Sequence, residues 1–204
     1  LYSNSIPSLS YPFTLSCWVY KTDDVAYAVY LTDKDASNIY FGIALGADDK
    51  VYLQASNTTN KNTNSDSTYT NQWVHVVASF ESATDRNLYI NGSQNTDNEN
   101  NDSVTYENID RISIGYLGDS SPTYSGSEII VDEVCVFSTG LNDSEALELY
   151  NNGLRLNATN HSLGNTNLVG YWRNNDLHTD GKWKDQISTN HLTANDTPNT
   201  IFFQ

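Results

Sequence analysis

Residues 131–153 have the sequence VDEVCVFSTGLNDSEALELYNNG, in which a strand pattern is followed directly by a helix pattern. Apolar side chains alternate with others through 128–138, as in a strand with one buried face. Asn142 can cap the first turn of the helix, and Glu145 three residues later completes a capping-box-like pair. The sequence therefore predicts a strand at 128–138 and a helix at about 143–152.

The predicted helix has a structural role. Gly153 is expected to end it, because glycine readily adopts the left-handed conformation found at helix C-termini. Ala146, Leu147 and Tyr150 fall close together on one face, which should dock on the edge of a sheet.

Seven further segments show the alternation or apolar character of strands. They are 13–20, 25–32, 38–45, 50–55, 72–80, 86–91 and 109–116. Two segments rich in Asn, Thr, Ser and Asp, 56–71 and 91–103, cannot bury apolar area and are expected to be surface loops. Strands do not alternate with helices, so a parallel α/β sheet is disfavoured. The pattern predicts an all-β fold, an antiparallel two-sheet jelly-roll sandwich with one short helix.

One domain is expected over residues 1–204, because β-sandwiches of this length commonly form a single core. Residues 154–204 contain a strand-like run at 168–174, a short apolar segment at 182–188 and an extended piece at 191–203. These are too few to build a separate core, so we expect a C-terminal extension that closes the same sandwich. A small appended subdomain is the alternative.

The formal net charge of −15 argues against several partners. Ten Lys and Arg against 25 Asp and Glu create a field that repels nucleic-acid phosphates and anionic lipid headgroups. No stretch approaches the ~18 unbroken apolar residues needed to cross a bilayer. Neither nucleic acid nor membrane is therefore expected as a partner.

The two cysteines, Cys17 and Cys135, lie in strand-like runs rather than in a Cys-x-x-Cys motif, so zinc is not expected. Whether they form a disulfide depends on whether their strands are neighbours. Two buried free thiols are the other outcome.

Five blocks of sequence, taken together and in order, resemble the laminin-G-like jelly rolls of the concanavalin A-like lectin/glucanase superfamily. They are FTLSCWVY, WVHVVASF, NLYINGS, ISIGY and VDEVCVFSTGLNDSEALELYNNG. The resemblance implies an antiparallel sandwich whose rim loops or concave sheet bind carbohydrate or protein, often with Ca²⁺ at the rim. It does not fix the ligand, since one fold serves many functions.

The tail is similar to a segment that in many such proteins precedes the FTLS strand. Here LVGYWRNND and WKDQISTNHLTANDTPNT follow the helix instead, an arrangement that resembles tail, fibre or capsid-associated proteins of phages. The chain departs from the usual Ser-Gly-Asn of this segment by having Ser188, Thr189 and Asn190 after Ile187.

Catalysis is not expected. Glycoside hydrolysis needs two carboxylates about 5 to 9.5 Å apart on the same side of a sugar. The nearest string here is Glu128, Asp132 and Glu133, and adjacent residues of a strand point to opposite faces. The pair Asp132 and Glu133 is expected to tie its strand to neighbouring backbone or to a basic side chain, with a metal or ligand role as the alternative.

Aromatic side chains beside turns are candidate platforms for the C–H faces of sugars. By this criterion the ligand-binding candidates are Tyr116, Tyr124 and Trp183. Other tyrosines alternate within strands and are interpreted as packing residues with a wet hydroxyl; they include Tyr27, Tyr40 and Tyr52.

Ca²⁺ is the one cofactor that the sequence suggests, because acidic turns supply the oxygen ligands it prefers. The candidate metal ligands are Asp48 and Asp49 in one turn and Asp119 in another. Solvated turn carboxylates are the alternative, and no other cofactor is expected.

We therefore expect a non-catalytic carbohydrate-binding or adhesion module on a virion surface, or on a cell surface or outside the cell. The alternative is a structural protein that decorates a capsid or joins a fibre through protein contacts. Expected partners are surface glycans or neighbouring virion proteins, and self-association stays open. A glycanase or lyase would require a pocket that gathers acids scattered in the sequence.

Overall fold

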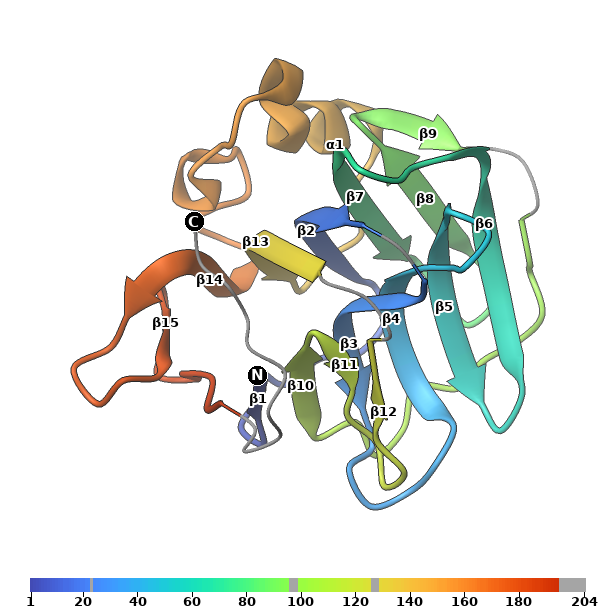
Figure 1. Ribbon diagram of the computed structural model, residues 1–204, viewed down its shortest axis with the longest axis horizontal. Coiled ribbons are helices and arrows are strands. Elements are labelled where there is room, and N and C mark those ends of the chain that lie inside the picture. The colour runs from blue at the N-terminus through green and yellow to red at the C-terminus, as the bar shows by residue number, and fades with distance from the viewer. Residues whose placement is uncertain (23, 96–98, 126–128, 195–204) are drawn as a thin grey trace.

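The computed structural model describes residues 1–22, 24–95, 99–125 and 129–194, and they form two large antiparallel sheets packed face to face (Figure 1). The six-stranded sheet has the order β1 (Tyr2–Ser3), β10 (Arg111–Ile114), β3 (Ala26–Thr32), β4 (Ile39–Leu45), β5 (Lys50–Asn57) and β6 (Asn60–Thr68). The seven-stranded sheet has the order β15 (Trp183–Asp185), β14 (Leu168–Leu177), β13 (Ile129–Phe137), β2 (Phe13–Lys21), β7 (Trp73–Phe80), β8 (Arg86–Ile90) and β9 (Ser93–Asn95). The hairpin of β11 (Tyr116–Leu117) and β12 (Thr123–Tyr124) forms a separate two-stranded sheet. The predicted all-β sandwich is confirmed.

The core lies between the two sheets and consists of side chains at alternate strand positions. Phe13 of β2 stacks on Phe80 of β7 with ring centroids 4.7 Å apart. Phe41 of β4, in the opposite sheet, meets both rings edge-on at 5.4 Å. All three side chains are fully buried, so this aromatic contact joins the sheets.

The polar segment 56–71, expected as a loop, is largely a strand. β5 continues to Asn57, and Asn60–Thr68 forms β6, which pairs antiparallel with it. Thr63 and Ser65 alternate inward and are buried, although neither is apolar. Backbone pairing along the sheet edge thus overrides the loop preference of the Asn-rich composition.

The predicted strand at 109–116 and loop at 91–103 also differ in detail from the structure. Gly115 has φ of 84° and divides the predicted strand into β10 and β11. β9 lies inside the predicted loop, of which residues 96–98 lie outside the described part. Residue 128 of the predicted strand 128–138 also lies outside it.

The predicted helix is present as α1 (Asp143–Tyr150), with a complete capping box between Asn142 and Glu145. Its end is not at Gly153 but at Asn151, whose φ of 49° supplies the left-handed turn. Two 3₁₀ helices follow at Asn151–Gly153 and Ala158–Asn160.

The docking face of α1 differs from the expected one at Leu147 alone. Two of the three expected contacts are present: Ala146 is buried against the seven-stranded sheet, and Tyr150 stacks on Trp18 of β2 with ring centroids 5.8 Å apart. The third residue, Leu147, is 52% exposed, and Leu149 is buried in its place. Residues three and four apart share a helix face better than adjacent residues do, so Leu149 and Tyr150 join Ala146 in the contact and Leu147 does not.

The C-terminal extension adds β14 and β15 to the seven-stranded sheet, beside β13 (Figure 1). Leu192 forms a bridge with Trp183, and Thr193 forms one with Tyr2 at the N-terminus. The rest of the predicted extended piece, 195–203, lies outside the described residues.

The acidic pair of β13 holds this extension. Asp132 accepts the backbone N–H of Asn174 at 2.8 Å and pairs with Arg155 at 2.6 Å. Glu133 pairs with Arg173 at 3.1 Å and accepts the hydroxyl of Tyr171. The structural role expected for the acidic pair is thus confirmed.

Cys17 and Cys135 are free and buried, although their strands are neighbours. Cys135 pairs with Ser16 across the sheet, so the Cys17 side chain points to the opposite face. Cys17 lies in the core between the sheets, and Cys135 lies beneath α1. Thiols on opposite faces of a sheet cannot form a disulfide without moving the backbone.

No helix among the described residues is both long and apolar enough to span a membrane.

Both thiols are expected to resist modification in the folded protein. Burial raises the pKa of each thiol, which leaves little thiolate, and Cys17 and Cys135 are 0% and 2% exposed. A chromogenic disulfide reagent should titrate neither thiol under native conditions and both in guanidinium chloride. Rapid reaction of either thiol in the native state would contradict this burial.

Candidate functional site

The outer face of the six-stranded sheet carries tyrosine and amide side chains in two rows that cross its strands. In the first row Tyr30, Gly42 and Gln54 are in register on β3, β4 and β5. In the second, Tyr40 on β4 is in register with Ser56, which pairs with Asn60 on β6. These positions alternate with core residues, so the outward direction of their side chains follows from the packing of the inner face.

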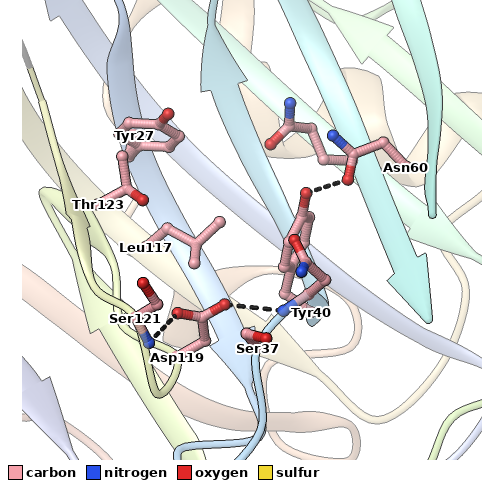
Figure 2. Close-up of a pocket in the computed structure, with 10 residues that line it drawn as sticks. Tyr27, Ser37, Tyr40, Asn60, Leu117, Asp119, Ser121 and Thr123 are labelled. Carbon is pink, nitrogen blue, oxygen red and sulfur yellow. Dashed lines mark hydrogen bonds between the residues drawn. The ribbon is translucent and has the colours of Figure 1, made fainter. Parts of the chain in front are cut away.

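In each row a tyrosine reaches an amide two strands away. The Tyr30 ring lies across Gly42, where a Cβ atom would overlap it, and its hydroxyl donates to Gln54 Oε1. The Tyr40 hydroxyl donates to Asn60 Oδ1 (Figure 2). A hydroxyl donates to each amide oxygen, which fixes the NH₂ group as the other end of each amide, and this group can donate to another molecule.

Burial keeps these tyrosines protonated. It raises the pKa of Tyr40 to about 12 and that of Tyr30 well above its ordinary value. Both hydroxyls therefore remain donors at neutral pH, so the orientations of Gln54 and Asn60 do not change with pH in that range.

A hollow of about 330 Å³ lies over these rows. Its lining residues are Tyr27, Ser37, Asn38, Tyr40, Gln54, Asn60, Leu117, Asp119, Ser121 and Thr123 (Figure 2). Tyr27, which is partly exposed, continues the aromatic floor, with its ring centroid 5.8 Å from that of Tyr30. The hollow thus combines an aromatic floor with amide, hydroxyl and carboxylate groups.

Asp119 forms one end wall of the hollow. Its Oδ2 accepts the backbone N–H of Asn38 at 2.9 Å, and its Oδ1 accepts that of Ser121 at 2.8 Å (Figure 2). The side chain is 4% exposed and connects the turn between β3 and β4 to the β11–β12 hairpin. Each carboxylate oxygen has further lone pairs that can accept a hydroxyl.

The sequence-based candidates Tyr116 and Tyr124 form a stacked pair, with centroids 5.4 Å apart and planes 17° from parallel. They are partners across the β11–β12 hairpin, as are Leu117 and Thr123. Since Leu117 and Thr123 line the hollow, Tyr116 and Tyr124 face away from it. Tyr116 is buried and Tyr124 is 37% exposed.

The third ligand candidate, Trp183, is 2% exposed and belongs to the core between the sheets. Its strand pairs with β14 on one side, and Leu192 pairs with its backbone. The ring has no open face on which a sugar could stack. The expectation of an exposed platform here is corrected, because the turn-like neighbours of Trp183 fold back over it.

The three candidate metal ligands lie apart. Asp48 accepts the Tyr52 hydroxyl at 2.8 Å, and Asp49 pairs with Lys21 at 2.8 Å, both in the turn after β4. Asp119 contacts Asn38, which comes just before β4. The seven residues of β4, at ~3.3 Å each, therefore place Asp119 roughly 20 Å from Asp48 and Asp49. Across the described ranges, no group of three or more His, Cys, Asp or Glu could hold a metal ion. The three aspartates do not form one calcium site.

Tyr27 and Tyr40 line the hollow, although the sequence pattern suggested packing roles for them. Tyr40 is 4% exposed and does pack, yet its hydroxyl and edge reach the hollow. The available signal was the combination of Tyr30, Tyr40 and Gln54 at positions that alternate with core residues. Gly42 in mid-strand was a second signal, since it indicates a close approach of another group.

The chain belongs to a family described as the concanavalin A-like lectin/glucanases superfamily, whose laminin G model matches residues 2–147. No curated protein sequence matches the chain.

Several solved structures share the fold. A Trypanosoma rangeli sialidase complexed with a difluoro-KDN is 18% identical, with a TM-score of 0.54 over 69% of this chain and 22% of its own. This chain therefore spans about a fifth of the sialidase. A heptameric SAP-like pentraxin from Limulus polyphemus is 13% identical, with a TM-score of 0.54 over 73% and 74%. The CBM40 of a Ruminococcus gnavus sialidase, bound to α2,3 sialyllactose, is 13% identical, with a TM-score of 0.54 over 72% and 84%.

Replacing Gly42 with alanine tests the floor of the hollow. The new methyl group would displace the Tyr30 ring, so Gly42→Ala should lower the free energy of unfolding by about 1–3 kcal/mol in urea denaturation. In a Tyr30→Ala background the same change should have a much smaller effect. Additive losses would show that the ring does not pack on Gly42.

Proposed function

We propose that this domain is a non-catalytic module that binds carbohydrate in the hollow on the outer face of the six-stranded sheet. The observation that carries the proposal is the pairing of an aromatic floor with oriented amides and a carboxylate in one concave site. Sugars present apolar C–H faces and hydroxyls that both donate and accept. The hollow offers a partner for each of these groups.

The proposed contacts divide by chemistry. The partly exposed Tyr27 ring supplies the surface for the C–H face of a sugar. Gln54 and Asn60 donate through NH₂ groups whose orientation the tyrosine hydroxyls hold. Asp119 accepts hydroxyls at the end wall. Because these groups are held before a ligand arrives, little side-chain entropy is lost on binding.

A binding role is favoured over hydrolysis. Glycosidases use two carboxylates that flank the scissile bond. Asp119 is the one carboxylate among the described lining residues, so no second carboxylate is present there to flank a scissile bond. The shared fold with a carbohydrate-binding module and a pentraxin supports the same choice.

We further propose that the module displays this site on a virion surface, with surface glycans as its partners. The support is the resemblance of the tail segment at 168–200 to phage tail, fibre and capsid-associated proteins. A structural role in a capsid or fibre would instead use the sheet edge at β6, which in the described part of the chain has a partner strand on one side only. Imaging of the native particle separates these roles. A number of copies per particle that is fixed by the symmetry of the lattice supports the assembly role.

Substitutions in the hollow should weaken glycan binding without unfolding the domain. With a glycan identified on an array, Tyr27→Ala and Gln54→Ala should each weaken binding about tenfold or more in calorimetry, a loss of ~1.4 kcal/mol. Tyr124→Ala is the matched control, because this tyrosine lies on the opposite face of the hairpin that lines the hollow. Equal losses in all three variants would place binding elsewhere.

Binding in this hollow is expected to survive chelation of calcium. Asp48 and Asp49 lie at the far end of β4, and Asp119 is the one carboxylate among the described residues that line the hollow, so no group of carboxylates gathers there to hold Ca²⁺. Affinity measured in EDTA and in millimolar CaCl₂ should therefore agree within about twofold, a difference of ~0.4 kcal/mol. Loss of binding in EDTA that calcium restores would indicate a cation at the site.

A further inference from the structure

We propose that the hollow selects neutral glycans and rejects those that carry a carboxylate or another anionic group at the bound sugar. This inference rests on the proposed function and adds the class of ligand to it. It follows from the positions of the Lys and Arg side chains and from the charge of the hollow itself.

All ten Lys and Arg belong to the described residues, so the position of every cationic side chain of these two types is known. None of them is among the residues that line the hollow. The five nearest in sequence to its walls are Lys21, Lys34, Lys50, Lys61 and Arg111.

Four of these five are held by other groups. Lys21 is buried and pairs with Asp49 at 2.8 Å, in the turn after β4. Lys34 pairs with Asp110 at 2.6 Å, and Arg111 donates to the Gly118 carbonyl at 2.8 Å. Lys61 follows Asn60 on β6 and pairs across the sheet with Ala55, which faces the core. Its side chain therefore starts on the opposite face of the sheet from the hollow. It forms an ion pair with Asp102 at 2.8 Å instead.

Lys50 is on β5 but lies four residues before Gln54, roughly 13 Å along the strand. An anionic sugar seated in the hollow would therefore find no positive partner at contact distance among the Lys and Arg side chains.

The charge that does line the hollow is negative. Asp119 lies at one end wall, and the protein carries a net charge of −15. Two unit charges of like sign at 4 Å repel enough, even in a water-like medium, to weaken binding roughly fivefold. Gln54 and Asn60 can donate to a carboxylate, but being neutral they cancel none of its charge.

Neutral sugars fit the same groups without this penalty. Asp119 can accept from their hydroxyls, and the two amides can donate to them. The CBM40 that shares the fold was solved with α2,3 sialyllactose, an acidic sugar. At 13% identity the likeness covers the fold, and the ligand groups of this hollow favour the opposite class of sugar.

The test is a glycan array on which each neutral glycan stands beside its sialylated, sulfated or uronic-acid counterpart. We expect the neutral member of each bound pair to bind at least about fivefold more tightly at ~0.1 M salt. Equal or tighter binding of the acidic members would overturn the inference while leaving the proposed function intact. Silence of every member would overturn the proposed function, and the inference with it.

A matched pair of charge variants separates the charge of the hollow from that of the whole protein. Ser121→Lys adds a cation at an exposed wall position, and Ser93→Lys adds the same cation on the exposed strand β9 of the other sheet. Ser121→Lys should raise acidic binding relative to neutral binding at least about fivefold, and Ser93→Lys should leave the ratio unchanged. Equal shifts in the two variants, or no shift in either, would contradict selection by the hollow. Thermal unfolding curves confirm that both variants are folded.

Discussion

The contact of Phe41 with Phe13 and Phe80 is the constraint from which the rest of the structure follows. It joins the two sheets, and in doing so fixes the direction of every side chain on β4. Once Phe41 points into the core, Tyr40 and Gly42 must point outward, because successive side chains of a strand alternate. The floor of the hollow is therefore a consequence of how the core is packed.

The outer faces of the two sheets differ in how far they are buried, because different segments cover them. α1 and the 3₁₀ helices after it bury an apolar cluster on the seven-stranded sheet, which includes Cys135, Phe137 and Tyr171. The β11–β12 hairpin covers only part of the six-stranded sheet, and its Leu117 and Thr123 form a wall rather than a lid. A polar concavity can exist only on the less covered sheet.

Local pattern was enough to predict the fold, since alternation marks the strands and the Asn142–Glu145 pair marks the helix start. It failed at β6, where the amide-rich composition of Asn60–Thr68 indicated a loop and pairing with β5 made a strand. Pairing between distant segments leaves little trace in local composition.

The candidate site was harder to predict for the same reason. Trp183 looks exposed beside its turns, and its burial follows from pairing with β14 on one side and with Leu192 on the other. Tyr116 and Tyr124 belong to the hairpin beside the hollow but to the wrong face of it. Asp119 lines the hollow, yet its position depends on the contact with Asn38, which is 81 residues away in the chain.

Alternation along β4 has an evolutionary consequence. On the proposed function, stability alone constrains Phe41 and Ile43 in the core, and ligand binding is an added constraint on Tyr40 between them and the turn. Positions at the rim, such as Ser37 and Ser121, can therefore drift through many side chains while the sandwich keeps its stability. Related domains could in this way diverge in the ligands they bind long before their folds diverge.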